Sequence, residues 1–453
     1  MPLGPLEVEI RSREGKYLSA KNFDLYVSKN IAELEREFGV VYDPVQLFPE
    51  DPSFARAVFE AGFKLLLDTG VYVIEQERIV KFSEEELKEA LRNCKPVLTI
   101  GEGKESKQLQ FRDVGSKTPP LVFGGYAGTP VSEEDYEPSA LSYALEPLVD
   151  AIDHGSISMV HGINSVNGAP SEVEATATEV KLLRKALLEA GRPGMHILAC
   201  ESSVSANGNL AAMSMGLLKQ SDAHLIPILN ELKVNYSQLV KSEAGLLCGV
   251  YNAALVDPII GGFARGAAGT AICAVAEVLA SIVIYSAAYV LIHPYHIRFK
   301  ATSAKECLWV ECAVGQAGHY ISLPLIGDVW PANGGGVIEM LYEIAANSVV
   351  ATTSGLNLLG PAPANGEKPN GCGLEARLMA QVGRAVTGLK PIEVVDVVKE
   401  LVKKYDATLL NPNPGLPFRE LYNIYERKPA GHWYEKYTGV KRELEDLGVQ
   451  LSE

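Results

Sequence analysis

Apolar positions along the chain follow two spacings. Between about residues 116 and 390, short apolar runs of strand length alternate with longer segments whose apolar residues recur at helical spacing. There are eight such runs, at residues 121–123, 157–160, 195–200, 223–228, 245–251, 295–301, 320–325 and 349–353. An eightfold strand–helix alternation is typical of a closed (β/α)8 barrel, the TIM-barrel fold. An open, doubly wound sheet is the alternative, because the pattern alone does not show closure.

The segments on either side of this region do not show the regular strand–helix alternation. Residues 52–69 show helical spacing, and the apolar runs 71–74 and 78–82 resemble a small hairpin. Ser83 followed by Glu86 is a capping box, which predicts a helix start. After residue 390, residues 391–404 and 440–447 predict two further helices. We therefore predict an α/β protein in three sections: an N-terminal helical and hairpin extension (1–115), the barrel (116–390) and a C-terminal helical arm packed on it (391–453).

One stretch, residues 266–292, is almost continuously apolar and long enough to span a bilayer. Glu277 is its single charged interruption, and no basic cluster flanks it. We interpret it as a helix buried in a large core or in a subunit contact. Because a helix that is apolar on all sides must be covered, we expect an oligomer.

Composition narrows the class of protein. The chain has 453 residues, 47% of them hydrophobic, and a formal net charge of −15. A strong negative charge disfavours nucleic acid and anionic membranes as partners. The seven cysteines are scattered without a CxxC pair, and the charged N-terminal residues contain no apolar signal core. We expect reduced thiols, no metal site and a cytoplasmic location.

Candidate chemistry lies in the loops after the predicted strands, where barrel enzymes keep their active sites. Glu201 ends the third apolar run, and a carboxylate there is costly unless it is hydrogen-bonded or used. Glu231 follows the fourth run. His296 and Arg298 alternate to the same face of the sixth run, so both can point inward. Glycines concentrate in the loops 124–130 and 334–336, which would let a bulky ligand approach the backbone closely.

Several motifs carry a family resemblance. They include GRPGMHILACESSVSANG at 191–208, GFKLLLDTGVYVIEQERIVK at 62–81, LNELK at 229–233 and GCGLEAR at 371–377. These segments are long, dispersed and in order, and they span nearly the whole chain. The chain resembles the monomethylamine methyltransferases of methane-producing archaea. That resemblance implies a (β/α)8 barrel, a homohexamer and transfer of a methyl group to the cobalt of a small corrinoid protein.

The resemblance also implies a site, and a departure from it. Where the family has pyrrolysine, this chain has Leu198, and the family's assisting glutamate is retained as Glu201. Two other polar positions of the family's pocket correspond to Leu255 and Val329. We therefore expect an apolar pocket of Leu198, Leu255 and Val329 around Glu201. Further expected donor-binding residues are Trp330, Tyr126, Glu231 and His296.

The functional prediction follows from leucine having no electrophile with which to capture an amine. A donor that already carries positive charge, such as a quaternary ammonium or sulfonium compound, needs no capture. The predicted reaction moves its methyl group to the cobalt(I) of a cognate corrinoid protein, with the corrinoid held by that partner and no cofactor held tightly by this chain. Two alternatives remain open: a non-catalytic homologue that binds a corrinoid protein or small ligand, and an unrelated TIM-barrel lyase or hydrolase that uses Glu201 and His296.

Overall fold

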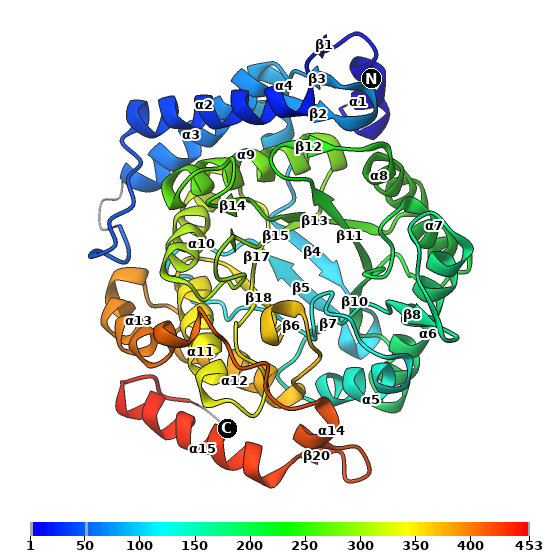
Figure 1. Cartoon of the computed structure of the whole chain (residues 1–453), viewed down its shortest axis with the longest axis vertical. Coiled ribbons are helices and arrows are strands. Elements are labelled where there is room, and N and C mark those ends of the chain that lie inside the picture. The colour runs from blue at the N-terminus through cyan, green and yellow to red at the C-terminus, as the bar shows by residue number, and fades with distance from the viewer. Residues whose placement is uncertain (1–2, 50–52, 452–453) are drawn as a thin grey trace.

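A closed barrel of eight parallel strands occupies the centre of the chain (Figure 1). The computed structural model describes residues 3–49 and 53–451. The barrel strands are β6 (Val122–Gly124), β7 (Ala151–Asp153), β10 (His196–Ala199), β11 (Ala223–Ile228), β13 (Tyr251–Val256), β15 (Tyr289–Ile292), β17 (Leu325–Asp328) and β18 (Asn357–Gly360). The ring closes because β6 pairs with both β18 and β7. The predicted (β/α)8 barrel is therefore confirmed, and the open sheet is excluded.

Each barrel strand is followed by a helix, and these helices surround the ring (Figure 1). They are α5 (Glu133–Ala144), α6 (Pro170–Glu189), α7 (Ala206–Ser214), α8 (Tyr236–Cys248), α9 (Ala267–Tyr285), α10 (Lys305–Ala317), α11 (Ile338–Thr353) and α12 (Gly373–Ala385). Because all eight strands run parallel, the loops after them meet at one end of the barrel, which we call the mouth.

Three of the eight predicted strands coincide with β6, β10 and β11, and five predictions are wrong in position. Residues 157–160 lie beyond β7, and Met159–Val160 belongs to a small hairpin, β8 (Met159–Val160) with β9 (Ile163–Asn164), outside the barrel. Residues 245–251 include the end of α8, and residues 349–353 are the last turn and a half of α11. Residues 295–301 follow β15, and residues 320–325 largely precede β17.

Helix α9 explains why the sixth strand was misplaced. Every residue of this helix is buried, and an apolar strand, β15, follows it after only three residues. Among the described residues it is the one helix long and apolar enough to cross a bilayer, and the chain buries its whole apolar window. It packs against α3 (Ser53–Thr69), α10 and α2 (Ala20–Phe38). Because the chain itself covers α9, this helix gives no reason to expect an oligomer, and the oligomer remains a prediction from the resemblance.

The N-terminal section covers one side of the barrel (Figure 1). It begins with α1 (Pro5–Ser12) and β1 (Lys16–Tyr17), and a hairpin of β2 (Val71–Val73) and β3 (Arg78–Val80) follows α3. Residue 52 of the predicted helix 52–69 lies outside the described residues. The capping box of Ser83 and Glu86 begins α4 (Glu84–Arg92), as predicted. Strand β12 (Lys233–Val234), from the loop after β11, joins this hairpin through β2 and ties the section to the barrel.

A second hairpin, β4 (Val97–Ile100) with β5 (Lys107–Gln110), lies across the barrel at the end opposite the mouth. Its side chains Leu98, Ile100 and Leu109 join the cluster that fills the barrel interior. The Tyr251 hydroxyl at the start of β13 donates a hydrogen bond of 3.1 Å to the Thr99 carbonyl oxygen. The hairpin therefore covers this end of the barrel.

The C-terminal section is helical, with α13 (Pro391–Tyr405), α14 (Phe418–Leu421), the short pair β19 (Tyr422–Asn423) and β20 (Lys428–Pro429), and α15 (Gly431–Asp446). Helix α15 is longer than the predicted segment 440–447. The Trp433 indole nitrogen donates to the Glu375 carboxylate on α12 at 2.9 Å, which fixes the arm to the barrel helices. The division into sections at residues 115 and 390 remains a prediction.

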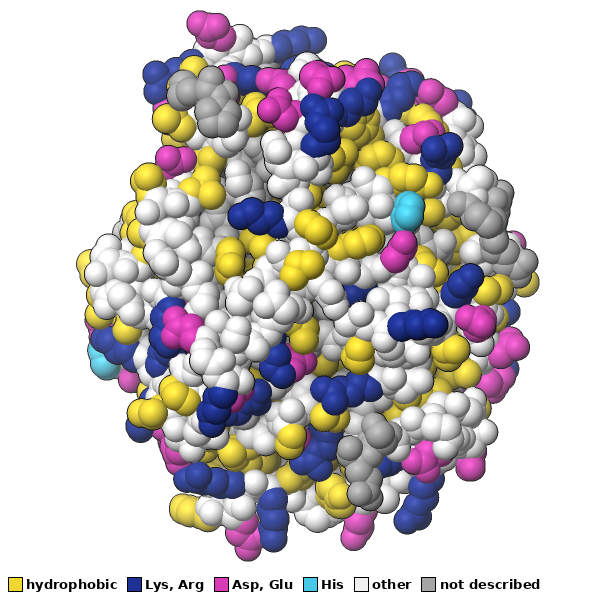
Figure 2. Space-filling model, turned by 180° about the vertical axis from the view of Figure 1, so that it is seen from behind, with side chains coloured by type: hydrophobic (Ala, Val, Ile, Leu, Met, Phe, Trp, Pro, Cys, Tyr) yellow, Lys and Arg dark blue, Asp and Glu magenta, His cyan; other side chains and the backbone are white. Residues whose placement is uncertain are grey.

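Charge is mixed on the surface. Figure 2 shows one face of the molecule, on which basic and acidic side chains alternate over short distances without a continuous basic area. That face offers no surface of the kind that binds a nucleic acid backbone.

Candidate active site

The interior of the barrel is filled from the closed end upward by aromatic and then aliphatic side chains. Phe123, His196 and Tyr289 form the aromatic layer, with ring centroids 5.6 Å apart between Phe123 and His196 and 5.8 Å between Phe123 and Tyr289. The His196 Nε2 lies 3.2 Å from the Tyr289 hydroxyl. Two residues further along each strand, Leu198 and Leu291 continue the filling toward the mouth. This packed floor leaves the mouth as the place where a ligand can reach the strands.

Three carboxyl groups gather above this floor. Asp153 ends β7, Asp328 ends β17, and Glu201 follows β10. Asp153 pairs in register with Leu198 on the neighbouring strand, and its carboxyl group lies within hydrogen-bonding reach of that of Glu201. Glu201 Oε2 lies 3.0 Å from the place where a side-chain carbon at Gly128 would sit, so the glycine in the loop after β6 makes room for this carboxyl group.

The three carboxyl groups have oxygens without protein partners. Asp153 Oδ1, Glu201 Oε1 and Asp328 Oδ1 are buried and accept no hydrogen bond from any residue that the structure describes. Within residues 3–49 and 53–451, no group of three or more histidine, cysteine or acidic side chains has the arrangement of a metal site. A buried carboxylate oxygen without a partner is costly, and a bound cation or a shared proton offsets that cost.

Burial sets the protonation of this group. It raises the pKa of Asp153 well above the ordinary value, and the nearby charge of Glu201 raises it further. Burial likewise raises the pKa of Glu201, the charge of Glu179 adds to the effect, and Lys241 opposes it. Two carboxyl groups in contact cannot both be ionised without a counter-charge, so Asp153 and Glu201 together hold one proton near neutral pH.

A histidine and a tryptophan complete the rim of the mouth. The His293 Nδ1 lies 2.8 Å from Asp328 Oδ2, and burial raises the pKa of Asp328 against the opposing influence of this histidine. The Trp330 ring packs edge-on against His293, with centroids 4.6 Å apart, and its indole N–H lies close enough to the Asp328 carboxyl group to lower the pKa of that group. Acidic groups, an aromatic face and aliphatic side chains thus meet at one place, a combination that suits an organic cation.

The turn that carries Glu201 is held by a carboxylate from the helix layer. Glu179 on α6 accepts the backbone N–H groups of Cys200, Glu201 and Ser202 at 2.8, 3.1 and 2.7 Å. Cys200 has a positive φ of 71°, which a side chain rarely adopts. Burial raises the pKa of Glu179 to about 6, although its hydrogen bonds oppose that rise. This role could not be predicted from the sequence, because Glu179 is one of several acidic residues on an amphipathic helix.

Leu198 and Leu255 both face the barrel interior. Both belong to the interior cluster; Leu198 is fully buried on β10 and Leu255 is partly buried on β13. Leu225 on β11 joins the same cluster and is an aliphatic residue that the sequence reasoning missed. Trp330 also contacts this cluster.

Val329 does not face the mouth, which corrects the expectation of three apolar residues around one pocket. Side chains alternate along β17, so Ile326 and Asp328 point inward and Val329 points to the surrounding helices. Its backbone N–H donates to Leu359 and its carbonyl oxygen accepts from Ala362, both at 2.9 Å. The inward residue at this strand end is therefore the carboxylate Asp328.

Tyr126, expected among the donor-binding residues, does not lie at the mouth. It is fully buried outside the barrel interior, stacked on His154 with ring centroids 4.7 Å apart. Its hydroxyl donates a hydrogen bond of 2.6 Å to the Gly371 carbonyl oxygen. The residue joins the loop after β6 to the start of α12, and the aromatic face of the mouth comes from Trp330.

His296 and Glu231 lie away from the three carboxyl groups. His296 is on β16 (Tyr295–His296), which pairs with β14 (Ile259–Ile260) beyond the ends of the barrel strands. Its ring accepts the Arg298 amide at 3.1 Å and stacks on Phe299, so it does not point inward. Glu231 accepts the Ile259 amide at 3.4 Å, and burial raises its pKa, with Lys233 and Asp24 as the nearby charges. A role in donor binding remains a prediction for both residues.

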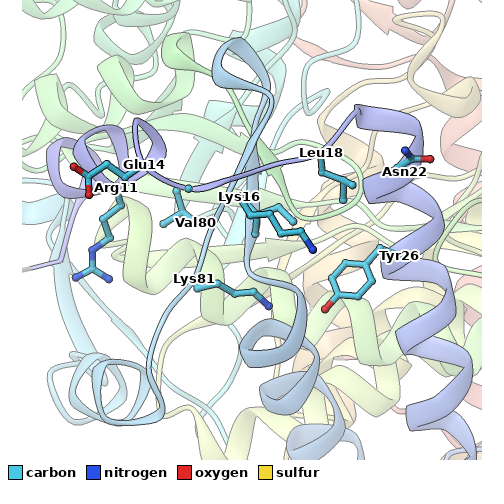
Figure 3. Close-up of a pocket in the computed structure, with 10 residues that line it drawn as sticks. Arg11, Glu14, Lys16, Leu18, Asn22, Tyr26, Val80 and Lys81 are labelled. Atoms are coloured by element: carbon cyan, nitrogen blue, oxygen red, sulfur yellow. The ribbon is translucent and has the colours of Figure 1, made fainter.

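Two pockets lie elsewhere on the molecule. One, of about 460 Å³, is lined by residues between 11 and 81, including Arg11, Lys16, Tyr26 and Lys81 (Figure 3). The other, of about 810 Å³, lies by α4 and the starts of β13 and β15, at the closed end of the barrel. Neither includes Leu198, Glu201, Asp153 or Asp328. The pocket expected around Glu201 is neither of these two and therefore remains a prediction.

Comparison with known proteins agrees with this architecture. A family model described as monomethylamine methyltransferase MtmB matches residues 6–449. The monomethylamine methyltransferase MtmB of Methanosarcina mazei is 33% identical over 448 residues, covering 97% of this chain and 96% of the relative. MtmB1 of Methanosarcina barkeri is 32% identical over the same shares. The crystal structure of the Methanosarcina barkeri enzyme matches with a TM-score of 0.95 and 31% identity over 99% of both chains, as does the crystal structure of a hydroxylamine complex of MtmB.

Proposed function

The chain belongs to the monomethylamine methyltransferase MtmB family, and from that membership we propose that it transfers a methyl group from a cationic methylated donor to the cobalt(I) of a cognate corrinoid protein, without pyrrolysine. The family supplies the class of reaction. Leu198, in the proposed place of pyrrolysine, changes the class of donor, because an aliphatic side chain cannot capture an amine covalently.

The three carboxyl groups beside Leu198 carry this proposal. Asp153, Glu201 and Asp328 bring up to three negative charges to one end of the barrel, and the His293 ring lies beside Asp328. A quaternary ammonium or sulfonium donor would supply the missing positive charge and place its methyl groups against Leu198 and Leu255. Trp330 would provide an aromatic face for the same cation.

The proposed reaction needs no covalent help from the chain. The bond from the methyl carbon to nitrogen or sulfur breaks with its electron pair staying on the leaving atom, which becomes neutral. The methyl carbon accepts the cobalt(I) electron pair and forms a carbon–cobalt bond. A positively charged leaving atom departs as a neutral molecule, whereas neutral monomethylamine would have to release an amide anion. Leu198, Leu255 and the carboxyl groups would orient the donor so that one methyl group faces the mouth.

A donor panel tests the proposal. The chain, its cognate corrinoid protein reduced to cobalt(I), and each donor are mixed, and the loss of the cobalt(I) absorption is followed. The panel contains monomethylamine, dimethylamine, trimethylamine, tetramethylammonium, choline, glycine betaine and a methyl sulfonium. We expect transfer from at least one quaternary or sulfonium compound and none above background from monomethylamine. Transfer from monomethylamine alone, or no transfer from any donor with a competent partner, would contradict the proposal.

A further inference from the structure

The carboxyl pair Asp153 and Glu201 has a consequence for how a donor binds. The two groups come from adjacent strands and lie in contact; Asp153 is buried and Glu201 is partly exposed. Each has an oxygen without a donor among the described residues, Asp153 Oδ1 and Glu201 Oε1. A proton shared by the two carboxyl groups relieves their repulsion. A permanent cation would relieve the same repulsion in a different way.

We infer that a donor with a permanent positive charge binds by displacing the proton shared by Asp153 and Glu201, so that binding releases about one proton to solvent. The inference rests on the proposed function for the identity of the ligand class. It adds that donor and proton compete for one place, and that the mouth favours cations that bring no proton of their own.

The surrounding charges support this assignment. Glu179 on α6, Lys241 on α8 and Asp328 on β17 act on the pair through their charges. The titratable groups Tyr136 on α5, Tyr289 on β15 and Cys200 beside Glu201 also face it. Lys241 is the one cation among these groups. Its ammonium donates a hydrogen bond of 2.6 Å to the Ser203 carbonyl oxygen, in the turn that carries Glu201. Glu179 and Asp328 add negative charge, so they favour either a retained proton or a bound cation.

The direction of the pH dependence follows. Burial and the like charges raise the pKa of both carboxyl groups, so the pair still holds its proton near neutral pH. A cation binds the deprotonated pair better than the protonated pair, so its affinity rises with pH. The rise ends at the pH where the pair in the unliganded protein has already lost its proton. In that range the dissociation constant falls by about tenfold per pH unit for a release of one proton.

Calorimetry with the whole chain tests this inference. Tetramethylammonium chloride is titrated at pH 7 in buffers with different enthalpies of ionisation, and the dependence of the observed heat on that enthalpy gives the number of protons released. We expect a value approaching one at pH 7 and a value near zero at a pH above the titration of the pair. Tetramethylammonium serves as the probe, and no corrinoid protein is needed.

Two single substitutions in the carboxyl pair test the same inference. In Asp153→Asn and in Glu201→Gln, the remaining carboxyl group has no ionisable partner, so we expect weaker binding with proton release reduced to a small fraction. Binding without proton release in the unmodified chain, or no binding at any concentration that leaves the protein folded, would overturn the inference. Proton-linked binding without methyl transfer would instead count against the proposed function and leave this inference standing.

Discussion

Replacing Glu201 by glutamine is expected to raise the KM for a quaternary donor by about 30-fold, with kcat changed less than about threefold. Losing one of the carboxylates that attract a buried cation costs roughly 2 kcal/mol, which corresponds to that factor. The donor nitrogen loses its positive charge as the methyl group leaves. The carboxylate therefore stabilises the bound donor at least as well as the transition state, and its removal acts on binding rather than on the chemical step.

Steady-state kinetics of cobalt methylation, with the donor varied at saturating corrinoid protein, measure this effect. Glu311→Gln is the matched control, because Glu311 is a fully buried glutamate on α10, in the helix layer outside the barrel interior. We expect the control to keep the KM of the unmodified chain within about twofold. A Glu201→Gln variant with unchanged KM and a kcat lowered a hundredfold would show that Glu201 acts as an acid in the reaction and not as a partner of the cation.

Replacing Glu179 by alanine is expected to lower the free energy of unfolding by about 3 kcal/mol. The substitution leaves the amides of Cys200, Glu201 and Ser202 without their common acceptor, and each unsatisfied buried donor costs roughly 1–3 kcal/mol before relaxation. The turn would loosen, because these hydrogen bonds offset the strain of the positive φ of Cys200.

Urea denaturation followed by circular dichroism measures the loss for Glu179→Ala. Glu174→Ala is the control, because this glutamate lies on the same helix, is about half exposed and contacts the exposed His161. We expect the control to change the free energy of unfolding by less than about 0.5 kcal/mol. Equal effects of the two substitutions would mean that the contact of Glu179 with three amides contributes nothing special to the fold.

The sequence predicted the barrel better than it predicted the strands. Alternation of strand and helix patterns was enough for the (β/α)8 fold, since a miscounted boundary leaves the count of units intact. The positions predicted for several individual strands were wrong for local reasons. The β-branched residues of 349–353 sit in α11 because tertiary packing overrides their preference for strands. Strand β7 was missed because it is only three residues long and ends in Asp153, which looks like part of a loop.

The candidate site was predicted in part for the same reason. Leu198, Leu255 and Glu201 lie on strands or turns whose position was right or could be counted from a flanking motif. Asp153 and Asp328 were missed as a pair with Glu201, because only closure of the ring brings the ends of β7, β10 and β17 together. The pocket position assigned to Val329 was wrong by one residue. Because side chains alternate along a strand, a shift of one residue moves a side chain from the inside of the barrel to the outside.

In the proposed function, a permanent cation occupies the mouth of the barrel beside Leu198. A crystal structure of the chain soaked with tetramethylarsonium, an isostere of tetramethylammonium whose arsenic scatters anomalously, tests it most directly. We expect an anomalous peak in contact with the carboxyl groups of Asp153 and Glu201 and with the side chain of Leu198. A mouth filled by its own side chains, with the arsenic absent or bound elsewhere, would contradict it.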